Sequence, residues 1–206
     1  MRDAGKTGTA LLRFGAREGD ASQAVALHLA QSVQDLEATY ANLTPQHVDE
    51  IVTALHAAPH VWLAGYRAGY PLASYLAMQI NQVLPAVAVI PKSGETLAET
   101  AATFSKSDVL ILLGLRRAPK SAAHVVRTAL DAGVQVALLS DVAELDALPV
   151  HWRLSCATTS KGPLLNHTGV LALCNLIASR TLELSGPEGR QRMGLIEDIH
   201  DRLGEL

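Results

Sequence analysis

The chain has 206 residues, with 17 basic against 20 acidic side chains and 49% hydrophobic residues. This length fits one large domain with a sizeable core. The near balance of charge, without a long basic tract, argues against direct nucleic-acid binding, and no run of about 18 apolar residues predicts a membrane span.

Apolar residues at helical spacing predict a helix over residues 21–43 and a second over 45–57, which Thr44 caps and Pro45 opens. Short apolar strands and helices then alternate. Strands are predicted over residues 61–64, 86–90, 109–113, 134–139 and 152–156. Helices are predicted over residues 72–83, 96–104, 121–132 and 164–184, with a helical turn near 142–148. Gly186-Pro187 ends the long helix, and a polar amphipathic helix closes the chain.

Strands that are almost entirely apolar are typical of a parallel sheet covered on both faces. With right-handed crossovers, the order of elements predicts an α/β fold: a three-layer α/β/α sandwich around a five-stranded parallel sheet in flavodoxin-like order, with added N- and C-terminal helices. Residues 1–20 are expected to be flexible, and residues 21–206 to form the domain.

Two strand-to-helix junctions point to a binding site: HVWLAGYRAGYP (60–71) and DVLILLGLRRAPK (108–120). In each, an apolar run ends in glycine, and arginine follows where a helix should begin. Ligands of open α/β sheets bind at the carboxyl ends of strands, where the strand order reverses. We expect that reversal between the first and third strands, so that Arg67 faces Arg116 and Arg117 across a pocket for a small anion.

This series of junctions resembles a SIS (sugar isomerase) domain over about residues 21–180, and specifically the effector domain of RpiR-type transcriptional regulators. In that family, hydroxyls of the patterns GxGxS and SxSGxT hold a sugar phosphate. Those patterns fall on Gly65, Arg67 and Gly69, and on Gly114, Arg116, Arg117 and Pro119. Only the first glycine matches, so we expect a larger or flatter anion, such as a heterocyclic carboxylate, with Tyr66 and Tyr70 stacking on it.

The predicted ligand-binding residues combine both junctions with two residues after later strands: Gly65, Tyr66, Arg67, Gly69, Gly114, Arg116, Arg117, Ser140 and His167. The structural alternatives are arginines paired with surface acids and tyrosines that only pack. No catalytic residue, metal site or cofactor is predicted. Glu95, Glu99 and His167 are the acid–base candidates if the protein is an isomerase.

The main interpretation is an effector-sensing domain of an RpiR-type regulator that binds a carbohydrate derivative or another small anionic metabolite. A phosphosugar isomerase and a degenerate scaffold are the alternatives. The resemblance implies a helix-turn-helix before the domain, and we expect contact with DNA only through such a module, for which some 20 N-terminal residues are too few.

A stripe on the last helix, Leu195, Ile196, Ile199 and Leu203, predicts a homodimer or tetramer. Cys156 and Cys174 are too few for a metal framework. We interpret them as reduced thiols of a cytoplasmic protein without a membrane partner.

Overall fold

The computed structural model describes residues 20–205 except Ser93, Arg117, Lys161 and Pro163. Its centre is one parallel sheet of five strands in the order β2-β1-β3-β4-β5, which confirms the predicted sheet and its flavodoxin-like order. The strands are β1 (Val61–Gly65), β2 (Val87–Ile90), β3 (Val109–Gly114), β4 (Gln135–Ser140) and β5 (Trp152–Ser155). The expected flexible residues 1–19 lie outside the described part.

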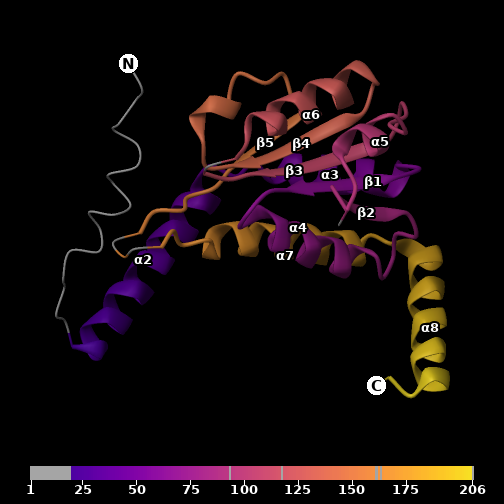
Figure 1. Cartoon of the computed structure of the whole chain (residues 1–206). Coiled ribbons are helices and arrows are strands. Elements are labelled where there is room, and N and C mark those ends of the chain that lie inside the picture. Colours follow the sequence, from indigo (N-terminus) through magenta and orange to yellow (C-terminus); the bar gives the residue numbers. More distant parts are fainter. Residues whose placement is uncertain (1–19, 93, 117, 161, 163, 206) are drawn as a thin grey trace.

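Helices cover both faces of the sheet, so the predicted three-layer sandwich is confirmed (Figure 1). One face carries α3 (Pro45–Ala57), α4 (Gly69–Ile80) and α7 (Thr168–Glu183). The other carries α5 (Leu97–Ala101) and α6 (Lys120–Asp131), and a single 3-10 turn, η2 (Ala143–Leu145), precedes β5. Two further helices, α2 (Ala21–Ala41) and α8 (Gly186–Leu203), project from opposite ends of the body toward the side of α4 and α7.

The central strand β3 explains why the apolar runs show no alternation. Ile111 and Leu113 belong to the core on the α7 side, whereas Leu110 and Leu112 belong to the core on the α6 side. All four side chains are completely buried. A strand covered on both faces needs apolar residues at every position.

Helix boundaries account for most differences from the predictions. The helix predicted from residue 164 begins at Thr168, and the Asn166 side chain accepts the Thr168 N–H at 2.9 Å in the turn that precedes it. The helix predicted from residue 72 begins at Gly69, since Pro71 is tolerated in a first turn. The helix predicted over 96–104 is a single short stretch, α5.

Candidate functional site

The carboxyl ends of β1 and β3 lie side by side at the point where the strand order reverses. Gly65 pairs in register with Leu113, and Gly114 with Ser140 of β4. The chain leaves β1 into α4 on one face of the sheet, and it leaves β3 toward α6 on the other. Open α/β sheets bind ligands where loops diverge in this way, so the predicted crevice lies above the ends of β1 and β3.

Three of the predicted binding residues are glycines at points of close backbone packing. A Cβ on Gly65 would lie 2.3 Å from the carbonyl oxygen of Gly69, and a Cβ on Gly69 would lie 2.8 Å from that of Leu113. A Cβ on Gly114 would lie 2.4 Å from Cδ1 of Leu145. Gly65 and Gly69 therefore allow α4 to start directly against β1 and β3, and Gly114 leaves room for the Leu145 side chain. Contact of the glycines with a ligand remains a prediction.

Arg67 and Arg116 occupy the two loops that border this crevice. Both side chains are exposed, and neither forms a hydrogen bond or ion pair with another described residue. Arg67 also has a φ of 53°, in the left-handed region that non-glycine residues rarely adopt. Strained backbone of this kind is concentrated at functional sites. Arg117, the third predicted arginine, lies outside the described residues.

The two aromatic candidates differ in exposure. Tyr70 is 40% exposed at the start of α4, and that exposure allows stacking on a ligand. Tyr66 packs against the core on the α6 side. Burial raises the pKa of its phenol, and the nearby Ser121 hydroxyl partly offsets that rise. At neutral pH the Tyr66 hydroxyl is therefore protonated.

Ser140 holds the ends of β3 and β4 together. Its hydroxyl donates to the carbonyl oxygen of Gly114 at 2.9 Å and accepts the N–H of Val142 at 3.1 Å. The side chain is buried. These bonds hold the loop that follows β4 in place. Contact of Ser140 with a ligand stays a prediction.

Polar residues after β4 and β5 add a feature that sequence reasoning missed. The hydroxyl of Thr158 donates to the Asp141 carboxylate, whose other oxygen is buried without a partner among the described residues. The hydroxyl of Thr159 donates to Asp35, a buried carboxylate of α2 that also keeps one oxygen unpartnered. The consecutive hydroxyl residues Thr158, Thr159 and Ser160, shortly after the last strand, were the available signal.

His167 lines a hollow that neither Arg67 nor Arg116 lines. This hollow, of about 320 Å³, lies between α2 and the loop that leads into α7. The described residues that line it include neither arginine: His28, Ser160, Gly162, Leu164, Leu165, Asn166 and His167.

The acid–base candidates after β2 are exposed. Glu95 and Glu99 both face solvent, and the Thr96 hydroxyl lowers the pKa of Glu99. A general acid at neutral pH needs a raised pKa instead. Within the described ranges no three His, Cys, Asp or Glu side chains are grouped for a metal ion, and no helix is both long and apolar enough to cross a bilayer.

Comparisons with known proteins agree with this architecture. The SIS domain profile matches residues 54–146, which include β1, β3 and both arginine loops. No curated protein sequence is significantly similar to the chain.

Several solved structures share the fold. The sugar isomerase domain of an RpiR transcription factor from Sphaerobacter thermophilus superposes with a TM-score of 0.76 at 20% identity, covering 84% of this chain and 97% of that one. The Vibrio vulnificus NanR protein complexed with ManNAc-6P gives a TM-score of 0.75 at 20% identity, covering 95% and 73%. A phosphoheptose isomerase from Francisella tularensis gives 0.61 at 14% identity, covering 81% and 98%.

Proposed function

We propose, on the premise that this chain contains a SIS domain, that it binds a small anionic metabolite in the crevice between β1 and β3 and acts as the effector-sensing domain of an RpiR-type regulator. The observation that carries the proposal is the pair of exposed arginines, Arg67 and Arg116, on the two adjoining loops. Two guanidinium groups at one strand edge provide the paired donors that carboxylates and phosphates accept.

The neighbouring structures support ligand binding in this class of fold. The NanR structure holds ManNAc-6P, a phosphorylated sugar derivative, and another neighbour, from Escherichia coli CFT073, is also a complex with a ligand. In this chain Arg116 stands at a serine position of the family pattern and Arg67 at a glycine position, and Tyr66 and Tyr70 flank Arg67. We therefore infer a carbohydrate derivative or a flatter anion, with Tyr70 available to stack on it.

The proposal extends to the setting of the domain. The ligand would bind one state of the assembly more tightly than the other. This difference in affinity would transmit binding to a helix-turn-helix module, as expected for regulators of this type. The free, buried thiols of Cys156 and Cys174 support a cytoplasmic location, where thiols remain reduced.

Thermal unfolding with a panel of sugar phosphates, sugar acids and heterocyclic carboxylates tests the proposal. A ligand at 100 times its Kd should stabilise the protein by about 2.7 kcal/mol. Arg67→Ala and Arg116→Ala should each weaken binding about tenfold or more, since a hydrogen bond to a charged group contributes about 1.5–3 kcal/mol. Arg127→Ala, which removes an exposed arginine from α6, is the matched control and should leave the response unchanged.

Two outcomes would replace the sensing proposal. Conversion of a sugar phosphate, followed by NMR, would assign the chain to the phosphosugar isomerases, which share its fold. No stabilisation by any anion of the panel would leave a dimerisation scaffold as the function.

A further inference from the structure

Three neighbouring strands of the sheet are each followed by a cation at the same position. The second residue after the end of the strand is Lys92 for β2, Arg67 for β1 and Arg116 for β3. These strands are adjacent in the order β2-β1-β3, and β1 pairs in parallel with both of the others. The three cations therefore follow strands that end side by side at the carboxyl edge of the sheet.

The other two strands are followed by neutral residues at this position. The corresponding residues are Val142 after β4 and Ala157 after β5. The cations are thus confined to the three strands centred on β1, with Lys92 on the far side of Arg67 from Arg116. A ligand that contacts more than the two arginines extends toward β2, and not toward β4.

Lys92 has no acidic partner among the described residues. Its side chain is exposed, and none of the ion pairs of the described residues involves it. Of the two acids that follow it, Glu95 bonds to Lys92 only through the backbone, where its N–H donates to the Lys92 carbonyl at 3.2 Å. Glu99 accepts the hydroxyl of Thr96 instead. Cations that lie close together repel one another, and an anion bound between them removes that repulsion.

Tyr66 keeps Lys92 and Arg116 apart. It follows the central strand β1 and packs against the core on the α6 side, the side to which the chain also runs after β2 and β3. Adjacent strands are about 4.8 Å apart, so β2 and β3 are about 10 Å apart across β1. One carboxylate or phosphate group is much smaller than this span. Lys92 is therefore placed for a second anionic group, separate from the group that the arginines bind.

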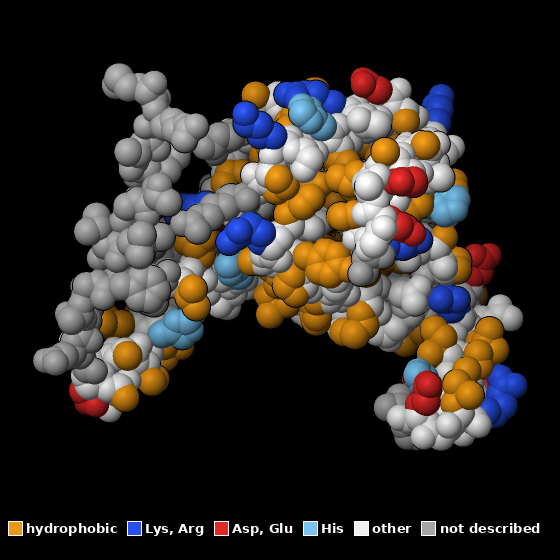
Figure 2. Space-filling view, in the orientation of Figure 1, with side chains coloured by type: hydrophobic (Ala, Val, Ile, Leu, Met, Phe, Trp, Pro, Cys, Tyr) orange, Lys and Arg blue, Asp and Glu red, His pale blue; other side chains and the backbone are white. Residues whose placement is uncertain are grey.

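The distribution of basic residues favours a small ligand over a nucleic acid. Figure 2 shows the Lys and Arg side chains of the face in view as separate groups, without a continuous basic band. A nucleic-acid backbone is bound along such a band. Three cations at one sheet edge instead match the charge of a small molecule with two anionic groups.

We propose that the ligand of the crevice carries two separate anionic groups, and that Arg67 and Arg116 bind one of them while Lys92 binds the other. The inference rests on the proposed function and adds Lys92 to it as a residue that determines specificity. The required chemistry is two anionic groups joined by a short neutral chain. Sugar derivatives with both a phosphate and a carboxylate have it, and so do dicarboxylates.

Two matched pairs of probes test the inference by thermal unfolding at low ionic strength. One pair is a 6-phosphoaldonic acid and its primary amide, and the other is adipic acid and its monoamide, so each amide lacks one anionic group. In at least one pair the wild type should bind the acid about tenfold more tightly than the amide, as a charged hydrogen bond predicts. The pair that shows this preference identifies the class of ligand.

Variants of Lys92 should act on this preference alone. Lys92→Met should abolish the preference for the acid and leave the affinity for the amide unchanged, whereas Lys92→Arg should retain the preference because it keeps the charge. Added salt should reduce the preference in the wild type, since Lys92 is exposed. Both variants should unfold at the wild-type Tm without ligand, because the substituted side chain packs against no core.

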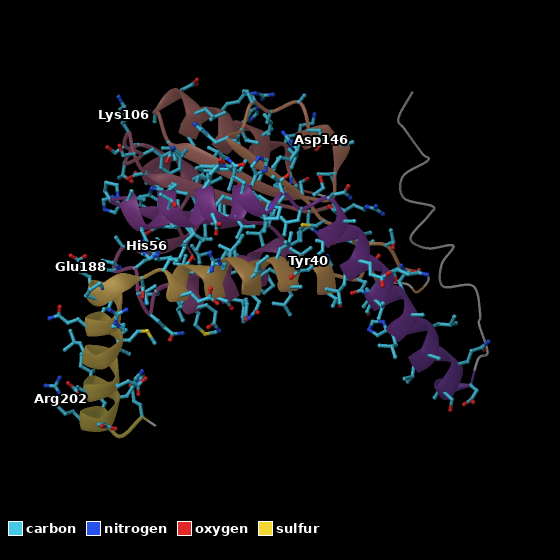
Figure 3. All side chains as sticks on the ribbon, turned by 180° about the vertical axis from the view of Figure 1, so that it is seen from behind. Tyr40, His56, Lys106, Asp146, Glu188 and Arg202 are labelled. Carbon is cyan, nitrogen blue, oxygen red and sulfur yellow. The ribbon has the colours of Figure 1, made fainter. Side chains whose placement is uncertain are left out.

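Lys106→Met is the matched control. Lys106 is also an exposed lysine, but it precedes β3 and so lies at the amino ends of the strands. Figure 3 shows Lys106 at the opposite end of the sheet from Asp146, which follows β4. This variant should bind acid and amide as the wild type does.

The outcomes separate this inference from the proposed function. Equal affinity for acid and amide in both pairs, or a preference that survives Lys92→Met, would overturn the inference. If binding of these compounds still required Arg67 and Arg116, the proposed function would stand without it. If none of the four compounds stabilised the protein, both would be overturned.

Discussion

At the scale of single residues, Arg67 combines two properties that seldom occur together. It is an exposed cation at the end of a buried strand, and its backbone has a φ of 53°. A left-handed conformation costs a non-glycine residue about 1–2 kcal/mol. The arginine at this position therefore carries a cost in folding stability.

Substitutions at residue 67 separate that cost from ligand binding. Arg67→Gly should leave the free energy of unfolding equal to or above that of the wild type, because glycine adopts the left-handed region freely. Arg67→Val should lower it by about 1–2 kcal/mol, since β-branched side chains tolerate this region poorly. Urea unfolding measures both, and the anion response should be lost in each. Equal stability of the glycine and valine variants would contradict the backbone argument.

At the scale of elements, α2 is fastened to the body by polar groups. The hydroxyl of Thr39 donates to the Asp35 carbonyl at 2.7 Å and accepts the N–H of Ala157 at 3.0 Å. Asn166 donates to the hydroxyl of Ser32 at 2.8 Å. A Cβ on Gly169 would lie 2.5 Å from the Thr39 hydroxyl, so α7 approaches α2 closely at this point.

Thr39→Val should therefore detach α2. Valine fills the same space but leaves the Ala157 N–H unpaired, at a cost of about 1–3 kcal/mol. Hydrogen exchange should speed up in α2 and in the loop after β5. The control is Thr53→Val in α3, which removes an equivalent hydroxyl that donates to the Asp49 carbonyl at an exposed site. Similar exchange in both variants would argue against a fastening role for Thr39.

The elements themselves were largely predictable, and the reasons are local. Apolar runs fix the five strands, and Gly133 and Pro45 mark helix ends that the structure confirms. The start of α7 was predicted four residues early, because Leu164 and Leu165 continue the apolar pattern although they lie in the loop before the helix.

The candidate site was predictable only in part. Sequence placed Arg67 and Arg116 on adjoining loops, since a doubly wound sheet reverses its strand order between the first and third strands. It missed Asp35 and Thr159, which are 124 residues apart and meet only because α2 folds back on the loop after β5. No local pattern encodes such a meeting.

At the scale of the whole molecule, the core encloses both thiols. Burial raises the pKa of Cys156 to about 12, with the charges of Cys174 and Asp141 adding to the rise, and burial also raises the pKa of Cys174 to about 12. Both thiols stay protonated at neutral pH, so they are unreactive while the protein is folded.

Thiol labelling with DTNB at pH 8 should find no reactive cysteine in the native protein and two after denaturation. Rapid labelling of the native protein would show that the thiols are accessible.

The raised pKa values of the two thiols also predict that the free energy of unfolding depends on pH. An unfolded thiol loses its proton near pH 8.5, well below the pKa of the folded thiol. The contribution of the buried thiols to the free energy of unfolding is therefore fully present below pH 8.5, and it declines as the pH rises toward 12. Urea titrations between pH 8 and 11 measure the decline.

The fastening of α2 has a mechanical consequence. Its bonds to Ala157, Thr159 and Asn166 come from several turns of one rigid helix and converge on a single loop. Turning or sliding the helix by part of a turn would break all of these bonds together, so we expect α2 to leave the body in one step.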